Sequence, residues 1–182
     1  MKNFTVPSRA EVSEKNQEIL AGLEKAVGFV PNLYSYYSKS DTALADYLAL
    51  ANRKTSLKAK EKEVVNLVVS QVNGCEYCQS AHTAIGKMNG FSDEQILELR
   101  KGSASFDSKL DALVKLAKSI TVNRGSASKE VVQGFFDAGY SEITLIDVVI
   151  LIADKTISNY IHNLAQFPID FPAAPKLEEV EA

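Results

Sequence analysis

The stretch EVVNLVVSQVNGCEYCQSAH, from Glu63 to His82, decides how this chain folds. Its first half is apolar and would fit a buried strand if it stood alone, but its long helical flanks favour a helix. Polar residues recur within it at helical spacing, at Glu63, Asn66, Ser70 and Asn73. A helix with this polar seam, followed by the turn-forming pair Asn73-Gly74, predicts an antiparallel helical hairpin.

The second half of the stretch holds both cysteines of the chain and one of its two histidines. We expect this helix to start near Cys75 and to end at Asn89-Gly90, so that Cys75, Cys78 and His82 occupy positions i, i+3 and i+7. These positions fall within about 60° of arc on one helix face. Residues three apart have Cα atoms roughly 5 Å apart, which a disulfide accepts. The pair could therefore close and reopen without rebuilding the backbone.

The same hairpin predicts a proton relay. Unpaired N–H groups at a helix N-terminus stabilise a thiolate, and His82 lies one turn beyond Cys78. Cys78 is therefore the better candidate for the attacking thiolate, with Cys75 as its resolving partner. Glu63 precedes the turn by about as many residues as His82 follows it, so its carboxylate should lie near the imidazole. We expect Glu63 to orient His82, and His82 to take the proton of Cys78.

The rest of the chain also indicates helices. Apolar residues at helical spacing predict them over residues 8–28, 33–53, 56–72, 92–102, 107–125, 128–139 and 141–167. The expected N-caps are Asp41, Ser56, Ser92 and Ser141. We found no convincing strand alternation. The sequence therefore predicts an all-α fold with a single helical domain over residues 1–166. Residues 167–182, with three prolines and no period, are expected to be an irregular tail along the surface or disordered.

A weak internal echo relates the hairpin to the last helix. KEVVNLVVS and IDVVILIAD align at an offset of 84, which matches Glu63 with Asp147 and Cys78 with His162. A bundle built from two related helical hairpins would explain it, and so would a shared need for a buried apolar helix. Asp147 and Asp154 are candidates for a second polar seam or a contact between subunits. The last helix is apolar around most of its circumference between residues 143 and 152, which predicts a homo-oligomer.

Composition excludes several classes of function. Of 182 residues, 46% are hydrophobic and 24% charged, and the net charge of −3 comes with dispersed basic residues. Neither nucleic-acid binding nor membrane binding is expected. The N-terminus lacks the continuous apolar core of a signal peptide, and the longest apolar run, residues 148–153, is too short to span a bilayer. We expect a cytoplasmic protein, in which paired cysteines are more often reactive or metal-binding than structural.

The hairpin residues resemble the signature of the alkylhydroperoxidase D branch of the carboxymuconolactone decarboxylase-like family. That signature is a Glu, eleven residues, Cys-x-x-Cys, three residues and a His. Glu63, Cys75, Cys78 and His82 match every member and every gap. GFVPNLYSYYSKS, residues 28–40, is similar to the region before the signature in peroxidase-related members. The resemblance covers residues 29–90, and the helical C-terminal half more loosely.

The resemblance implies an all-α, AhpD-like helical bundle, usually a homo-oligomer, that works without a metal or organic cofactor. It implies a thiol cycle in which Cys78 attacks a peroxide, Cys75 resolves and an external dithiol restores the pair. Alkylhydroperoxidase D itself carries a His just before its second cysteine, where this chain has Tyr77. Tyr77 is therefore a secondary candidate for the site.

Other interpretations stay open at this point. The cysteines could be inert buried residues, a redox switch without turnover, or zinc ligands together with His82 and His162. His162 could instead be a satisfied helix histidine or a residue that lines the site. Glu63 could be a solvated side chain on the first turns of its helix. A decarboxylase-type reaction would need an acid and a base, which a dithiol does not supply.

Overall fold

The computed structural model describes residues 4–177, and within them the chain is helical without any strand. After a short 3₁₀-helix, η1 (Arg9–Glu11), come the α-helices α1 (Glu14–Val27), α2 (Asn32–Tyr37), α3 (Ala43–Ala51), α4 (Ala59–Val72), α5 (Glu76–Met88), α6 (Asp93–Lys101), α7 (Ser108–Val122), α8 (Lys129–Asp137) and α9 (Glu142–Ala165). The predicted all-α fold is confirmed.

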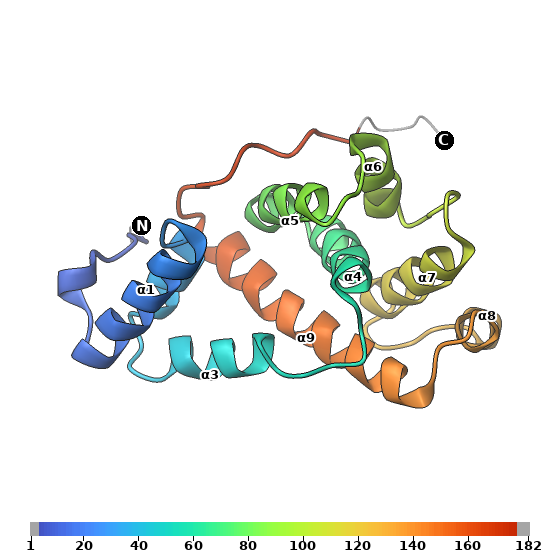
Figure 1. Cartoon of the computed structure of the whole chain (residues 1–182), viewed down its shortest axis with the longest axis horizontal. Helices are drawn as coiled ribbons and strands as arrows, with labels where there is room; N and C mark the ends of the chain where they lie inside the picture. The colour runs from blue at the N-terminus through green and yellow to red at the C-terminus, as the bar shows by residue number, and fades with distance from the viewer. Residues whose placement is uncertain (1–3, 178–182) are drawn as a thin grey trace.

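Helix α4 lies at the centre of the bundle, where it packs against α5, α6, α7 and α9 (Figure 1). One apolar core joins α4 to α6, α7, α8 and the first half of α9. A second core lies under α1, α2 and α3 and includes both cysteines. The long helix α9 runs diagonally from the N-terminal helices past α4 (Figure 1) and contributes residues to both cores. The cysteine pair therefore lies where the N-terminal helices meet the central hairpin.

The predicted hairpin of α4 and α5 is present, with the turn where the sequence indicated it. Gly74 adopts φ +65°, a left-handed conformation that glycine accepts without steric cost. The Cys75 N–H then donates to the Ser70 carbonyl at 3.0 Å, which closes the turn. Helix α5 ends at Met88 with Asn89 as its C-cap, as expected. This tight turn fixes the register in which α4 and α5 face each other.

Two of the four predicted N-caps are wrong. Ser92 and Ser141 cap α6 and α9 as expected. Helix α3 begins at Ala43 after Thr42, one residue beyond the predicted cap Asp41. Helix α4 begins at Ala59, where the Glu61 carboxylate accepts the Lys58 N–H at 2.8 Å. Ser56 lies outside that helix because its N–H and hydroxyl both bind the carboxylate of Asp147.

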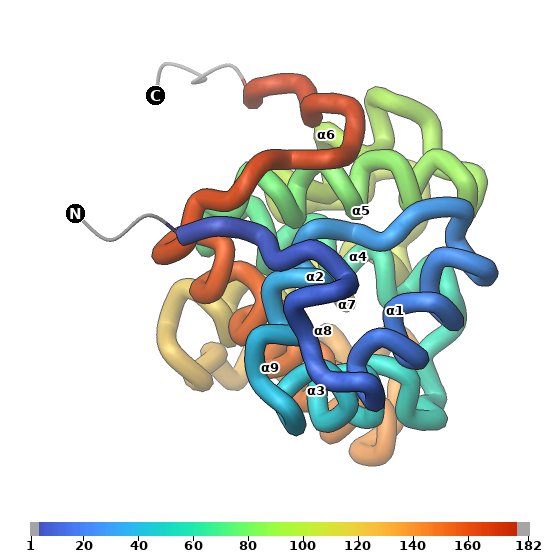
Figure 2. Tube along the Cα trace, turned by 90° about the vertical axis from the view of Figure 1, so that its left-hand side faces the viewer, coloured from blue at the N-terminus to red at the C-terminus, as the bar shows by residue number. Residues whose placement is uncertain are grey.

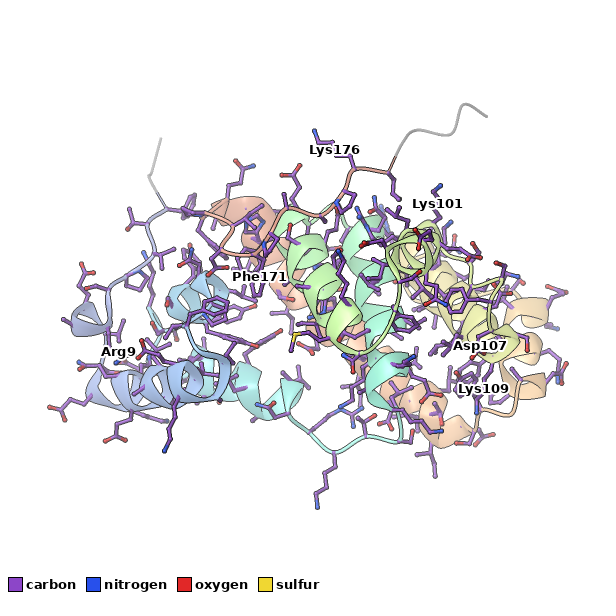
Figure 3. The ribbon with its side chains drawn as sticks, turned by 45° about the horizontal axis from the view of Figure 1, so that its top comes forward. Arg9, Lys101, Asp107, Lys109, Phe171 and Lys176 are labelled. Atoms are coloured by element: carbon purple, nitrogen blue, oxygen red, sulfur yellow. The ribbon has the colours of Figure 1, made fainter. Side chains whose placement is uncertain are left out.

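The segment after α9 lies along the surface, one of the two alternatives predicted for it. It runs without regular structure over α5 toward α6 (Figures 1 and 2). The Ala174 N–H donates to the Ser80 hydroxyl at 3.1 Å, and Arg100 donates to the Pro175 carbonyl at 2.7 Å. Figure 3 shows Phe171 between α5 and the N-terminal helices. The predicted tail beyond residue 177 lies outside the described residues.

No helix within residues 4–177 has the length and apolar character needed to cross a lipid bilayer.

Candidate active site

The hairpin brings Glu63 and His82 together, as the sequence predicted. The Oε2 atom of Glu63 lies 2.8 Å from Nδ1 of His82, and both side chains are buried. The other carboxylate oxygen, Oε1, accepts the side-chain amide of Asn66 at 2.9 Å. A carboxylate at Nδ1 selects the tautomer with its proton there, which leaves Nε2 free to accept a proton. The alternative of a solvated Glu63 is thereby contradicted.

The electrostatics of this pair favour an ionised carboxylate. Burial raises the pKa of Glu63, but the charge and hydrogen bond of His82, with the bond from Asn66, outweigh it and lower the pKa overall. A buried carboxylate in this state orients the imidazole and stabilises its protonated form. The pair can therefore hold a proton that leaves a neighbouring thiol.

Cys75 and Cys78 are both free thiols and both buried. Cys75 is the N-cap of α5 and has extended backbone angles, so the helix starts at Glu76. The predicted common helical face therefore holds for Cys78 and His82, and is wrong for Cys75. The Cys75 sulfur accepts the Cys78 N–H at 3.3 Å. Cys75 stays outside the helix because, as the N-cap, its sulfur accepts a hydrogen bond from a backbone N–H that would otherwise be unpaired.

The two thiols differ strongly in acidity. A hydrogen bond from the Cys75 thiol, opposed by burial and aided by Lys155, His82 and Asn159, lowers the pKa of Cys78 to about 6. The same hydrogen bond, together with burial, raises the pKa of Cys75 far above its ordinary value. Cys78 is therefore the thiolate at neutral pH and Cys75 the thiol that donates to it. Among residues 4–177 no hydrogen bond joins His82 to the Cys78 sulfur, so the predicted relay is complete only from Glu63 to His82.

Two residues of α9 that the sequence analysis missed lie at this site. Lys155 and Asn159 are one helical turn apart, both are buried, and both lower the pKa of Cys78. The carboxamide of Asn159 also bonds to the side chains of Asn73 and Ser70 on the polar seam of α4. The sequence offered one signal for these two residues, namely a charged side chain and an amide side chain inside an otherwise apolar helix. Nothing in their spacing from the cysteines could connect them.

A pocket of about 570 Å³ gives access to Cys78 and His82. Its walls are mainly apolar and aromatic, and include Phe29, Tyr34, Tyr47, Tyr77 and Phe171. Lys155 also lines it, whereas Cys75 does not. A small organic molecule in this pocket would meet the Cys78 sulfur first. Cys75 lies behind that sulfur, as a resolving thiol should.

Tyr77 and His162, the secondary candidates, belong to an aromatic cluster instead. The Tyr77 hydroxyl accepts the Leu33 N–H at 3.3 Å, and its ring lies 5.1 Å from that of His162. The Nε2 atom of His162 is 3.1 Å from the Phe167 carbonyl. Both residues hold the segment after α9 against α2 and α5. Tyr77 lines the pocket together with Cys78 and His82, whereas His162 does not.

The zinc alternative lacks its ligand set. No group of three or more His, Cys, Asp or Glu side chains is placed to hold a metal ion within the described range 4–177. His162 instead lines a different, more polar pocket of about 600 Å³, with Gly74, Glu76 and Phe167 among its other walls. That pocket contains neither cysteine. Of these two pockets, only the apolar one is lined by Cys78 and His82.

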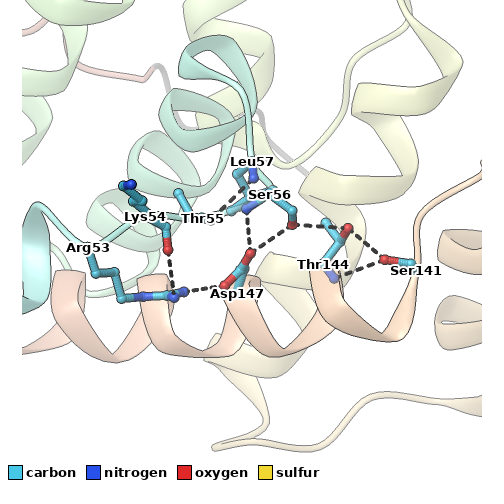
Figure 4. Close-up of polar contacts among 8 residues, drawn as sticks. All are labelled: Arg53, Lys54, Thr55, Ser56, Leu57, Ser141, Thr144 and Asp147. Carbon is cyan, nitrogen blue, oxygen red and sulfur yellow. Dashed lines mark hydrogen bonds and ion pairs between the residues drawn. The ribbon is translucent and has the colours of Figure 1, made fainter.

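Asp147 and Asp154 form part of the second polar seam that was one interpretation of their spacing. Asp147 binds Arg53 at 2.6 Å and the backbone and hydroxyl of Ser56, which fastens the loop before α4 onto α9 (Figure 4). Burial raises the pKa of Asp147, but these hydrogen bonds outweigh it and hold the pKa below its ordinary value. Asp154 is buried one turn before Ser158. Neither carboxylate lines the pocket above Cys78.

Comparison with known proteins agrees with this geometry. The model of the carboxymuconolactone decarboxylase family matches residues 39–119, which include both cysteines, Glu63 and His82. No curated protein matches the sequence at a significant level. The matched segment is the part of the chain that builds α3 to α7.

Several solved structures share the fold at low identity. An alkylhydroperoxidase AhpD core protein, an uncharacterized peroxidase-related protein from Ralstonia eutropha JMP134, superposes with a TM-score of 0.79 at 18% identity over 87% of each chain. A peroxidase-related protein from Silicibacter sp. TM1040 gives 0.78 at 18% identity over 91% of each chain. The debrominase Bmp8 gives 0.76 at 18% identity over 92% of this chain and 91% of that one. At this identity the likeness shows the fold.

Proposed function

We propose that this chain, whose residues 39–119 match the model of the carboxymuconolactone decarboxylase family and whose fold is shared with an AhpD core protein, is a thiol-dependent oxidoreductase that reduces peroxides. The observation that carries the proposal is the pair of unlike thiols at the pocket. Cys78 has a pKa of about 6 and lines the pocket, while Cys75 remains a buried thiol in contact with it. An acidic thiol at the wall of a pocket, beside a second thiol, is the arrangement that peroxide reduction requires.

The first step oxidises Cys78. Its thiolate attacks the terminal oxygen of a peroxide ROOH, which breaks the O–O bond and leaves a sulfenic acid on Cys78. The departing RO⁻ takes a proton and leaves as the alcohol ROH. His82 can supply that proton from Nε2, and Glu63 on Nδ1 stabilises the imidazole while it is protonated. The apolar walls of the pocket suit a peroxide with an organic body.

The second half of the cycle restores the site. The Cys75 thiol attacks the sulfenic sulfur, which forms the Cys75–Cys78 disulfide and releases water. An external dithiol then reduces this disulfide by thiol–disulfide exchange and leaves as its own disulfide. The balance is one peroxide and one dithiol consumed for one alcohol, one water and one disulfide formed. No organic cofactor enters this cycle.

The first test measures peroxide consumption with dithiothreitol as reductant and cumene hydroperoxide as substrate. We expect turnover by the wild type and none by Cys78→Ser, because the attacking thiolate is missing. With Cys75→Ser we expect one rapid equivalent of peroxide consumed and a sulfenic acid trapped at Cys78. His82→Ala should slow the first step by about a hundredfold, more than Glu63→Gln does.

The same assay has outcomes that would overturn the proposal. A wild type whose thiols close to a disulfide in peroxide but never turn over would be a redox switch rather than an enzyme. Two thiols that persist in excess peroxide would make the pair structural. Turnover by Cys78→Ser equal to that of the wild type would point to a contaminating activity, and Ser126→Ala, at a residue outside the pocket, should keep the turnover of the wild type.

A second candidate reaction is reductive debromination of an aromatic compound. It is favoured by the aromatic pocket walls at Cys78 and by the shared fold of a debrominase that has been solved with 2,3,4-tribromopyrrole. In this reaction the Cys78 thiolate takes bromine from the ring, the ring carbon gains a proton, and Cys75 displaces bromide to form the disulfide. Bromide release from tribromopyrrole without activity on cumene hydroperoxide would favour this candidate over peroxide reduction.

A further inference from the structure

The pocket above Cys78 contains a lysine that no step of the proposed cycle uses. Lys155 lies in the second half of α9, and only 7% of its surface is exposed. It lines the pocket together with Cys78 and His82. Among residues 4–177 its ammonium group has no hydrogen bond and no carboxylate oxygen within 4.0 Å. A buried cation without such a partner is costly unless some other charge compensates it.

The neighbouring acidic groups leave Cys78 as the uncommitted anion in the pocket. Glu63 on α4 is already bound to His82 and Asn66. Asp154 precedes Lys155 on α9 but lines a separate narrow pocket beside Arg53 and Asp147. No aspartate or glutamate lines the pocket that Lys155 shares with Cys78. The thiolate is therefore the negative charge inside this pocket, in addition to the charge of Asp154 at the adjacent position of α9.

The tyrosines around the lysine do not supply a charge either. Burial raises the pKa of Tyr34, Tyr37 and Tyr47, so these phenols stay neutral at physiological pH. Burial lowers the pKa of Lys155, but the nearby charges of Asp154, Cys78 and Glu63 outweigh it and raise the pKa overall. Lys155 therefore remains an ammonium ion at the pH where Cys78 is a thiolate.

We propose that Lys155 is a positioning residue whose ammonium keeps Cys78 as a thiolate and thereby shifts the Cys75–Cys78 couple toward its reduced form. When an external dithiol reduces the disulfide, two electrons enter the pair. One proton stays on Cys75 and the other is released, because Cys78 is left as a thiolate beside Lys155. A couple whose reduced form is stabilised in this way is more easily reduced. The consequence of this inference for turnover rests on the proposed function, whereas the test of the inference does not.

The test measures the Cys78 thiol and the redox equilibrium without any peroxide. In Lys155→Met the pH profile of Cys78 alkylation by iodoacetamide should move upward, with the rate at pH 6 about tenfold lower. The equilibrium of the pair with glutathione at pH 8 should move up to tenfold toward the disulfide, which corresponds to about 30 mV. Lys155→Arg should keep both values close to the wild type, because it keeps the charge.

Two controls separate charge from structure. Lys87→Met removes a lysine from the exposed side of α5 and should change neither value. Asp154→Asn/Lys155→Met removes one charge of each sign from neighbouring positions of α9, so the net charge of the region is kept, and it should still show an upward shift. An alkylation profile and a glutathione equilibrium that match the wild type in folded Lys155→Met would overturn the inference.

A measurement on the wild type covers the case in which no variant folds. The buried ammonium of Lys155 should be recognisable by slow hydrogen exchange in a ¹⁵N–¹H correlation spectrum. Its titration should occur at lower pH in the disulfide form than in the dithiol form, because oxidation removes the negative charge of Cys78. Identical titration in both forms would overturn the inference. Absence of peroxide turnover would overturn only the proposed function, since none of these measurements depends on it.

Discussion

At the scale of single residues, the site depends on the unequal treatment of two cysteines three positions apart. Cys75 caps α5 and keeps its proton, while Cys78 sits one turn inside the helix and loses it. The largest influence on the pKa of Cys78 is the hydrogen bond from Cys75. Cys75 therefore has two roles in the proposed cycle, because it activates the attacking thiol before it resolves the product.

This double role predicts different effects of two substitutions at Cys75. Cys75→Ala removes the hydrogen bond, so the pKa of Cys78 should rise from about 6 by roughly one unit, equivalent to about 1.4 kcal/mol. Cys75→Ser leaves a hydroxyl that can donate and should raise it less. The measurement is the pH dependence of Cys78 alkylation, followed by mass spectrometry. An unchanged midpoint in Cys75→Ala would show that the helix terminus and α9 account for the acidity alone.

At the scale of elements, one carboxylate of α9 decides where α4 can begin. Asp147 accepts from Arg53 and from the backbone and side chain of Ser56, so the loop that precedes α4 is fixed to α9 (Figure 4). Since α4 carries Glu63, this attachment also fixes the register of the acid against His82. The electrostatic consequence is a stability that depends on pH.

Asp147→Asn tests this attachment. The pKa of Asp147 is depressed in the folded protein, so its contribution is present above the unfolded value of about 3.9 and is lost as the pH falls toward the folded value. At pH 7 the variant should lose about 1–3 kcal/mol of unfolding free energy, and the difference from the wild type should shrink below pH 4. Urea unfolding at several pH values measures it. The exposed Asp41→Asn is the control, and a pH-independent difference would contradict the assignment.

At the scale of the whole molecule, α9 presents two different faces. One face is buried against α4 and the N-terminal helices, and carries the polar seam. The other exposes apolar side chains at helical spacing, namely Ile143, Ile146, Val149, Ile157, Tyr160 and Leu164. Exposed apolar stripes of this kind mark contact surfaces. We propose that this stripe is the interface of the homo-oligomer that the apolar circumference of the helix predicts.

The proposed assembly is tested by mass in solution. Light scattering at micromolar concentration should give a multiple of the 19.9 kDa chain mass, because burial of the stripe stabilises the assembly. Ile146→Lys should lower that mass, since it places a charge in the apolar interface. Val122→Lys, at an exposed apolar residue of α7, should leave it unchanged. A wild type with the mass of one chain would contradict the proposal.

Helix positions and the central hairpin were predictable because their signals are local. The 3.6-residue period, the left-handed Gly74 and the capping residues Ser92 and Ser141 act over a few residues each. The predicted cap Asp41 lies one residue before the observed cap Thr42, and the predicted cap Ser56 was wrong because another partner competes for its groups. For Ser56 that partner is Asp147, ninety-one residues away. A capping motif states what a side chain can bind, and tertiary packing decides what it does bind.

The sequence by itself determined the contact of Glu63 with His82 and the place of both cysteines at the start of α5. A tight turn joins two helices of known rise, so residues equally far from the turn must meet. Only the tertiary structure decided that Lys155 and Asn159 join this site, that Tyr77 belongs to an aromatic cluster, and that His162 holds the segment after α9. These residues lie on α9 or face it, and no spacing rule fixes the rotation of a helix about eighty residues away. That rotation is set by the sum of its packing contacts, which exists only once the chain has folded.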